Sequence, residues 1–256
     1  MRGTTCAGDE ARLVEEALHD GVETIVVAGG DGTWSKCAVP LARAGSPARM
    51  AFLAAGTGND FAKNLDIAVR TPALLAQRLA DGARERHVDL GRVDDTWFLN
   101  VAGFGLDVAV LERSNASPLL RGKAVYLAAA LQELVRYRGL EAAYDERWTR
   151  RLILVFSNGK HFGGAFRVAP DARIDDGLLD AILVDDVPVL RRLPLLLRVM
   201  RGTLQGHPRV SHRRVARFRL AFRERPWFEA DGELHRAAGA TVEVASVPGA
   251  LRVVDG

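Results

Sequence analysis

The apolar positions in the first third of the chain alternate between two regular patterns. Residues 9–19 carry apolar side chains at helical spacing, and Gly21 follows as a stop signal. Residues 24–28 form a continuous, β-branched apolar run, which is typical of a parallel strand covered on both faces. The series continues with a predicted helix over 34–44, a second buried strand over 51–54 and a helix over 72–80.

After about residue 84 the pattern changes, because the strand-like runs are no longer separated by helices. Helices are predicted only over 119–138 and 189–201. The predicted strands cover residues 87–90, 96–101, 152–156, 216–222, 227–230 and 241–244. This series of elements indicates a mostly β, sandwich-like second domain.

The two patterns together predict a two-domain fold. Residues 1–83 form an α/β domain that is doubly wound around a parallel sheet, and its ligands bind at the C-terminal ends of the strands. Residues 84–256 form the β-rich domain, whose last residues we expect to pack back on the first domain. Because a doubly wound domain normally opens with a strand and residues 1–8 are polar, we expect the first domain to be N-terminally truncated and to lack its first strand.

The composition fits a folded protein with a basic surface. Charged residues make up 26% and hydrophobic residues 48%, and the formal net charge is +3. Residues 191–225 contain eleven Arg and one acid, Glu224, together with a run of Leu. This stretch either meets an anionic bilayer or is a solvated face. Nucleic acid is not an expected partner, because the basic charge is the single feature of the sequence that favours it.

Cysteine content and hydropathy bear on location. Cys6 and Cys37 are too few for a disulfide framework or a zinc site of thiolates, which fits a reducing cytoplasm. No stretch approaches the roughly 20 apolar residues that a spanning helix needs. We therefore expect a cytoplasmic protein whose membrane contact is peripheral, on the inner face.

The first predicted strand leads into Gly29-Gly30-Asp31-Gly32-Thr33. Three glycines permit positive backbone torsions and close approach, so consecutive amides at the start of the next helix can bind a phosphate. Asp31 would hold Mg²⁺ beside that phosphate, because its own charge otherwise repels the anion. The alternative is a tight turn in which Asp31 caps the helix.

A second glycine turn, Gly56-Thr57-Gly58-Asn59-Asp60, follows the second predicted strand. It offers backbone amides, the Thr57 hydroxyl and the Asn59 amide to a nucleotide. Because the C-terminal ends of parallel strands meet at one edge of a sheet, both turns are expected on the same edge. This placement favours a phosphate-binding site over two plain turns.

Two acidic motifs in the second domain have two interpretations each. Asp231-Gly232-Glu233 supplies a carboxylate to a substrate hydroxyl, or Asp231-Gly232 is a hairpin turn between strands. Asp175-Asp176-Gly177 is a site for a hard cation or a plain turn. The residues alone leave these alternatives open.

The order of these motifs along the chain resembles that of the diacylglycerol kinase catalytic family, which includes bacterial lipid kinases and sphingosine kinases. The resemblance covers nearly the whole chain. It rests on the two glycine turns and on Asn100-Val101-Ala102-Gly103-Phe104-Gly105, Pro170-Asp171-Ala172, residues 175–180 and Asp231-Gly232-Glu233.

The resemblance implies an ATP-dependent lipid kinase that transfers the γ-phosphate to a lipid hydroxyl, of diacylglycerol or a related lipid alcohol. It implies Glu233 as catalytic base, with Asp231 beside it and Asp31 at the phosphates. It implies a structural Mg²⁺ bound by the Asp176 carboxylate and the carbonyls of Arg173 and Leu178. The implied ATP contacts in the interdomain cleft are Gly29, Gly30, Asp31, Gly32, Thr33, Trp34, Ser35, Thr57, Gly58, Asn59, Asp60 and Thr4.

Expected partners are the lipid substrate at the membrane surface and, in a homodimer, a second copy of the chain. Two other functions stay open. An NAD kinase shares a Gly-Gly-Asp-Gly turn, but it also needs an Asn-Glu pair, and no Asn-Glu dipeptide occurs in this sequence. A nucleotide- or lipid-binding protein without turnover would retain the same turns.

Overall fold

A computed structural model describes residues 1–65, 71–116, 123–164 and 166–255. The described helices are α1 Asp9–His19, α2 Asp31–Arg43, the short 3-10 helix η1 Phe61–Asn64, α3 Pro72–Ala80, α4 Leu106–Asn115, α5 Lys123–Arg136 and α6 Val189–Arg201. The strands are β1 Thr24–Gly29, β2 Arg49–Ala54, β3 Arg84–Val93, β4 Thr96–Phe98, β5 Val101–Gly105, β6 Leu140–Tyr144, β7 Arg147–Ser157, β8 Leu179–Asp185, β9 Val210–Val215, β10 Arg217–Phe222, β11 Trp227–Ala230, β12 Glu233–Arg236 and β13 Thr241–Asp255.

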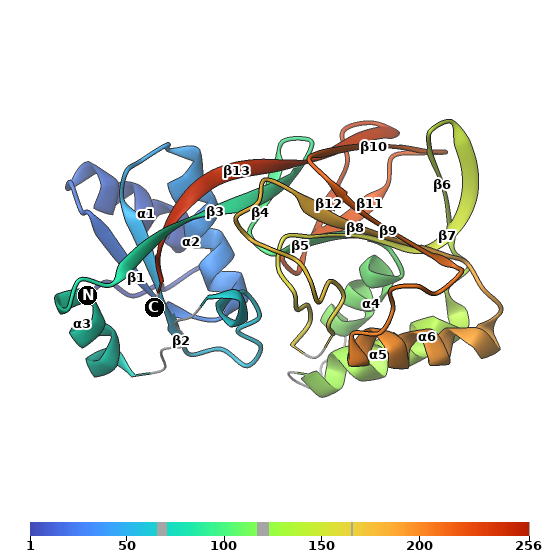
Figure 1. Cartoon of the computed structure of the whole chain (residues 1–256), viewed down its shortest axis with the longest axis horizontal. Coiled ribbons are helices and arrows are strands. Elements are labelled where there is room, and N and C mark those ends of the chain that lie inside the picture. The colour runs from blue at the N-terminus through green and yellow to red at the C-terminus, as the bar shows by residue number, and fades with distance from the viewer. Residues whose placement is uncertain (66–70, 117–122, 165, 256) are drawn as a thin grey trace.

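The first half of the molecule is a doubly wound α/β layer structure (Figure 1). Strands β1 and β2 are parallel, with Val27 opposite Phe52, and the end of β13 lies parallel to β2 on its other side. Helices α1 and α2 bury Val14, Trp34 and Leu41 against one face of this sheet. Helix α3 buries Leu75 against the opposite face. The predicted fold of this part is confirmed.

Strand β13 connects the two halves (Figure 1). Its first residues pair with β10 in the second half, and its last residues pair with β2 in the first. Along most of its length it also pairs antiparallel with β3. The C-terminus of the chain therefore lies in the first half, next to β2.

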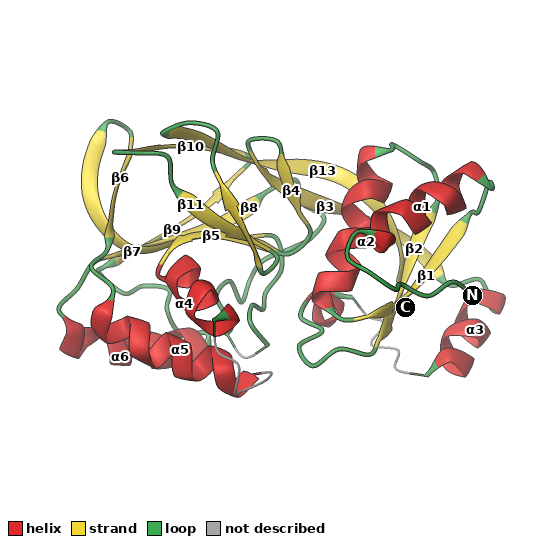
Figure 2. Cartoon of the chain, turned by 180° about the vertical axis from the view of Figure 1, so that it is seen from behind, coloured by secondary structure: helices red, strands yellow, loops and turns green. Residues whose placement is uncertain are grey.

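The second half is a sandwich-like arrangement of antiparallel strands with three helices below it (Figure 2). An aromatic core fills the space between its strands, and within it the rings of Phe104 and Phe222 stack at 5.2 Å. A separate core lies between the strands and helices α4, α5 and α6. The expected β-sandwich-like domain is thus confirmed, with a helical layer on one side.

Several elements differ from the sequence prediction. Strands β6, β8, β9 and β12 were not predicted, and β13 extends to Asp255 where residues 241–244 were expected. The strand expected over 96–101 is broken at Leu99 and Asn100 into β4 and β5, because the amides there bond a side chain instead of a neighbouring strand. Helix α4 was not predicted, since it is buried at five positions between Leu106 and Leu111 and shows no amphipathic period. Helix α2 begins at Asp31, three residues earlier than expected.

Candidate active site

The two glycine turns pack backbone against backbone at the C-terminal ends of β1 and β2. A Cβ atom added to Gly56 would lie 2.5 Å from the Cα of Gly30. At Gly29, an added Cβ would lie 2.7 Å from the Cβ of Thr33. The glycines of the first turn do not have positive φ angles, so the expected torsional reason for them is wrong and close approach explains Gly29 and Gly30.

Asp31 is the first residue of α2 and does not cap it, so the helix-cap alternative is wrong. Its Oδ1 accepts a hydrogen bond from the Phe61 amide at 3.0 Å. An added Cβ on Gly58 would lie 2.8 Å from Asp31 Oδ2 and 3.6 Å from Asp60 Oδ2, so two carboxylates converge there. Burial, and then the nearby charge of Asp60, raise the pKa of Asp31. The Asp31 carboxylate lines the cleft described below, and an oxygen ligand of this kind fits a hard cation.

The second glycine turn is held by its own side chains. Asn59 has a φ of 50°, and its amide bonds both the N–H and the C=O of Gly56. Asp60 is buried, forms an ion pair with Lys63 and accepts the Gly164 amide at 2.6 Å. These two side chains therefore shape the turn and join it to the second domain. Thr57 is exposed and lines the cleft described below.

The Asp231 carboxylate joins the hairpin of the second domain to the first domain. Asp231 and Gly232 are the two-residue turn between β11 and β12, both with positive φ, so the hairpin interpretation is correct. The carboxylate accepts the Ser35 hydroxyl at 2.6 Å and the amides of residues 99, 100 and 101 at 2.5, 2.9 and 3.0 Å. With four donors, this side chain is held in place, and Ser35 is committed to it.

Glu233 contrasts with Asp231 although it stands only two residues later. Its side chain is 53% exposed, and its Oε1 lies 2.7 Å from Lys36 Nζ. Lys36 follows Ser35 in α2, so consecutive residues of one helix bond both acids of the hairpin. Hydrogen bonding to Glu233 raises the pKa of Lys36.

A cleft of about 280 Å³ lies between these parts of the two domains. From the first domain it is lined by Asp31, Thr57, Gly58, Asp60 and Phe61. From the second it is lined by Leu99, Asn100, Val101, Leu111, Phe162, Gly163, Gly164, Asp231 and Gly232. Of the sequence-predicted site residues, the cleft brings together Asp31, Thr57, Gly58, Asp60 and Asp231, while Glu233 is not among its described lining residues.

Eight predicted nucleotide contacts are not among the described residues that line the cleft: Gly29, Gly30, Gly32, Thr33, Trp34, Ser35, Asn59 and Thr4. Thr4 is exposed in the segment before α1 and is not among the described residues that line the cleft. Trp34 is fully buried in the core of the first domain, where its indole donates to the carbonyl of Val27 at 3.2 Å. Its side chain is therefore not available to a nucleotide, and its amide is bonded to Gly30.

The sequence of both halves matches known families. A profile of the diacylglycerol kinase catalytic domain matches residues 1–93, and a profile of the YegS C-terminal NAD kinase beta sandwich-like domain matches residues 100–255. The chain belongs to the diacylglycerol kinase and YegS family of lipid kinases.

Several relatives in this lipid kinase family align over nearly the whole chain. A "Probable lipid kinase YegS-like" protein of Pseudomonas aeruginosa is 37% identical over 99% of this chain and 83% of its own length. A diacylglycerol kinase of Mycobacterium tuberculosis is 30% identical over 97% of this chain and 82% of its own. The crystal structure of a diacylglycerol kinase from Bacillus anthracis superposes with a TM-score of 0.71 at 19% identity, over 99% of this chain and 83% of that one, which shows a common fold.

The lipid kinase resemblance also implied Mg²⁺ at Asp176. The Asp176 Oδ1 accepts the Leu178 amide at 3.0 Å, and its Oδ2 forms an ion pair with Arg214. Apart from Arg214, the buried Oδ2 has no hydrogen-bond partner among the described residues. The roles assigned to Asp176, Arg173 and Leu178 stay a prediction.

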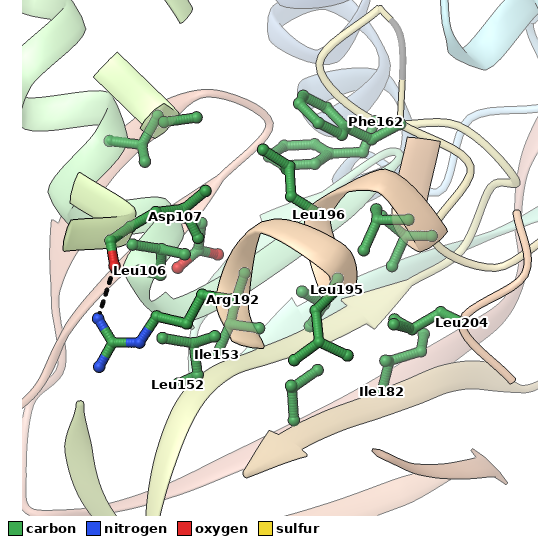
Figure 3. Close-up of a pocket in the computed structure, with 18 residues that line it drawn as sticks. Leu106, Asp107, Leu152, Ile153, Phe162, Ile182, Arg192, Leu195, Leu196 and Leu204 are labelled. Carbon is green, nitrogen blue, oxygen red and sulfur yellow. Dashed lines mark hydrogen bonds between the residues drawn. The ribbon is translucent and has the colours of Figure 1, made fainter. Parts of the chain in front are cut away.

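An apolar cavity of about 100 Å³ lies behind the cleft, between the strands of the second domain and its helices (Figure 3). Leu195, Leu196 and Val199 of α6 line it, opposite Leu152 and Ile182. Its charged lining residues are Asp107 and Arg192. Phe162 lines both this cavity and the cleft, so the two spaces adjoin at one side chain.

Two carboxyl groups are buried close to this cavity. Asp107 Oδ2 and Glu229 Oε1 have no hydrogen-bond partner among the described residues. Burial raises the pKa of Asp107 to about 7, and burial followed by the charge of Asp107 raises that of Glu229. Gly103 leaves the room for this pair, because its added Cβ would lie 1.5 Å from Asp107 Oδ2.

Sequence reasoning missed the loop of the second domain that completes the cleft. The Lys160 amide donates to Asn64 Oδ1 at 3.0 Å, and the Gly164 amide donates to Asp60. One signal was available: Lys occurs at only four positions, and three of them, Lys36, Lys63 and Lys160, contribute contacts at or beside the cleft. The adjacent pair Gly163-Gly164 in a polar segment was a second signal.

Proposed function

We propose that the chain transfers the γ-phosphate of ATP to the hydroxyl of a lipid, diacylglycerol or a related lipid alcohol. The observation that carries the proposal is the pairing of two spaces. A cleft with the second glycine turn and the carboxylates of Asp31 and Asp60 on one wall adjoins an apolar cavity at Phe162. A nucleotide suits the first space and a hydrocarbon chain suits the second.

The nucleotide side is supported by the start of α2. The Gly30-to-Asp31 junction places a helix N-terminus at the cleft, and helix N-termini favour phosphate through their unpaired amides and dipole. Mg²⁺ would be held by Asp31, which lines the cleft, and it would neutralise phosphate charge during transfer.

The acceptor side is supported by the β11–β12 hairpin. Asp231 is held by four donors, so it fixes the position of the turn. Glu233 is exposed, and its side chain contacts the ammonium group of Lys36. A carboxylate of this kind can accept the proton of an attacking hydroxyl, which contributes about 10²- to 10⁴-fold to the rate. We assign Glu233 as the base and Asp231 as its positioning residue.

A transfer assay with labelled ATP tests the proposal. The protein is incubated with Mg-[γ-³²P]ATP and either diacylglycerol in mixed micelles, a total lipid extract or NAD. We expect label in the organic phase with diacylglycerol or the extract, and none on NAD. Label on NAD would assign the chain to the NAD kinase alternative, and nucleotide binding without label in any product would assign a binding protein without turnover.

A further inference from the structure

Helix α6 is apolar on the side that faces the core and on the side that faces solvent. Leu195, Leu196 and Val199 pack inward at the apolar cavity. Leu190 is 90% exposed, Leu193 48% and Leu197 42%. An ordinary surface helix turns a polar face to water, so this outer face lacks an explanation in the folded chain alone.

The neighbouring helix α5 extends the same surface. Arg192 of α6 donates to the carbonyls of Leu134 and Tyr137 at the end of α5, which fixes the two helices together. Figures 1 and 2 both place them at the same end of the second domain. On the outer side of α5, Leu131 is 44% and Val135 64% exposed.

The exposed charged side chains that the structure describes on α5 and α6 are all positive. Arg136, Arg191, Arg198 and Arg201 are exposed, and none of them forms an ion pair with any residue that the structure describes. The segment from Val187 to Phe222 contains no acidic residue. The surface formed by α5 and α6 therefore combines apolar side chains with unbalanced positive charge.

We propose that this α5–α6 surface docks on an anionic lipid bilayer. The Leu side chains enter the interface between headgroups and acyl chains, while the Arg side chains meet lipid phosphates. A second copy of the chain fits less well, because a two-fold dimer brings a surface against itself and would oppose Arg to Arg. An anionic bilayer supplies the opposite charge and an apolar phase together.

The position of the α5–α6 surface agrees with the proposed lipid kinase function, and this agreement, unlike the docking itself, rests on that function. The inner face of α6 lines the apolar cavity, and that cavity adjoins the cleft at Phe162. A bilayer on the outer face of α6 would stand one helix away from the space proposed for the acceptor chain. The lipid acceptor would then leave the bilayer beside its own binding site.

Vesicle sedimentation of the whole protein tests the docking surface without turnover. The vesicles are phosphatidylcholine with or without phosphatidylglycerol. We expect binding only with phosphatidylglycerol, and weaker binding at high salt. The variant Arg191→Gln/Arg198→Gln/Arg201→Gln should bind about 100-fold more weakly, from about 1 kcal/mol for each Arg near the surface. Leu190→Gln/Leu193→Gln/Leu197→Gln should lose at least about tenfold.

A matched pair of single substitutions controls for the effect of removing any exposed Leu. Leu197 and Leu74 are each 42% exposed on a helix, but Leu74 lies on α3 in the first domain. Leu197→Gln should weaken vesicle binding several-fold and Leu74→Gln should leave it unchanged. Equal binding by all variants would overturn the proposal, as would sedimentation of the Leu variant as a monomer where the parent protein is a dimer.

Turnover of a short-chain, water-soluble diacylglycerol should be unaffected by these substitutions. A parent protein without that turnover would therefore contradict the proposed function and not the docking surface.

Discussion

The two walls of the cleft are built differently. The wall of the first domain consists of two glycine turns that touch through their backbones, and Asn59 and Asp60 are committed to holding it. The wall of the second domain carries one locked carboxylate, Asp231, and the same hairpin carries one exposed carboxylate, Glu233, which is not among the described residues that line the cleft. The difference teaches that one wall is shaped to bind, while the other keeps a reactive group accessible at a fixed hairpin.

The largest expected effect comes from the exposed carboxylate. Glu233→Gln should lower the rate of phosphate transfer by about 10²- to 10⁴-fold, because the amide does not accept the hydroxyl proton. The affinity for Mg-ATP and the melting temperature should stay unchanged, since Glu233 makes no contact in the first wall beyond Lys36 among the described residues. Kinetics in mixed micelles measure the rate, and Glu224→Gln serves as the exposed-acid control. Retained turnover would remove Glu233 as the base.

The second largest effect is on stability and comes from the buried pair behind the second wall. The pKa of Asp107 is raised to about 7 in the folded state. The protonated Asp107 carboxyl therefore makes its full contribution to the free energy of unfolding below the usual carboxyl pKa. This contribution, a few kcal/mol, is lost as pH rises through about 7. Asp107→Asn should flatten this part of the unfolding free energy against pH and make the protein more stable than the parent at pH 8.

Urea unfolding at several pH values measures that change. Asp145→Asn, at an exposed acid, should leave the pH dependence as it is. A parent protein whose stability does not fall between about pH 4 and 8 would show that Asp107 is ionised in the fold.

A smaller effect separates two reasons for glycine in the first wall, close backbone packing at Gly56 and room for phosphate at Gly32. Gly56→Ala should destabilise the protein by about 1 to 3 kcal/mol, because its Cβ would meet the Gly30 backbone. Gly32→Ala should leave the free protein as stable or more stable by up to about 1 kcal/mol, since an added Cβ meets nothing within 4 Å. If phosphate approaches the start of α2, Gly32→Ala should still weaken Mg-ATP binding. Thermal melts with and without nucleotide measure the change in stability and the change in Mg-ATP binding. Full Mg-ATP binding by Gly32→Ala would contradict the approach of phosphate to the start of α2.

The smallest effect concerns the contact between the walls at Lys36. Lys36→Met removes a partly exposed ion pair, and such pairs contribute about 0.2 to 1 kcal/mol. We expect a loss in kcat of less than about tenfold and little change in melting temperature. A loss as large as that of Glu233→Gln would instead show that Lys36 contacts a reacting group.

Much of the first wall was predictable because its signals are local. The buried strands, the glycine turns and helix α3 follow from periodicity and turn residues within a few positions. The reason for the glycines was not predictable, since Gly30 and Gly56 touch across a gap of 26 positions in the sequence. Their close approach depends on the register of β1 and β2.

The second wall was less predictable because its contacts are distant in sequence. Asp231 takes its donors from residues about 130 and 196 positions away, and those bonds break the strand that apolar pattern predicted over 96–101. Helix α4 has no amphipathic period, and strand β9 reads Val-Ser-His-Arg-Arg-Val. Among the described residues no helix is long and apolar enough to cross a membrane, in agreement with the hydropathy of the sequence.

The most direct test of the account is a calorimetric titration of Mg-ATP into the parent protein and into Asp31→Asn. Asp31 stands at the start of α2 and faces Asp60 across Gly58. The account predicts one site per chain in the parent protein and an affinity at least about 10- to 100-fold lower in the variant, with an unchanged melting temperature. Equal affinity in both proteins would contradict it, because the first wall would then not be where the nucleotide binds.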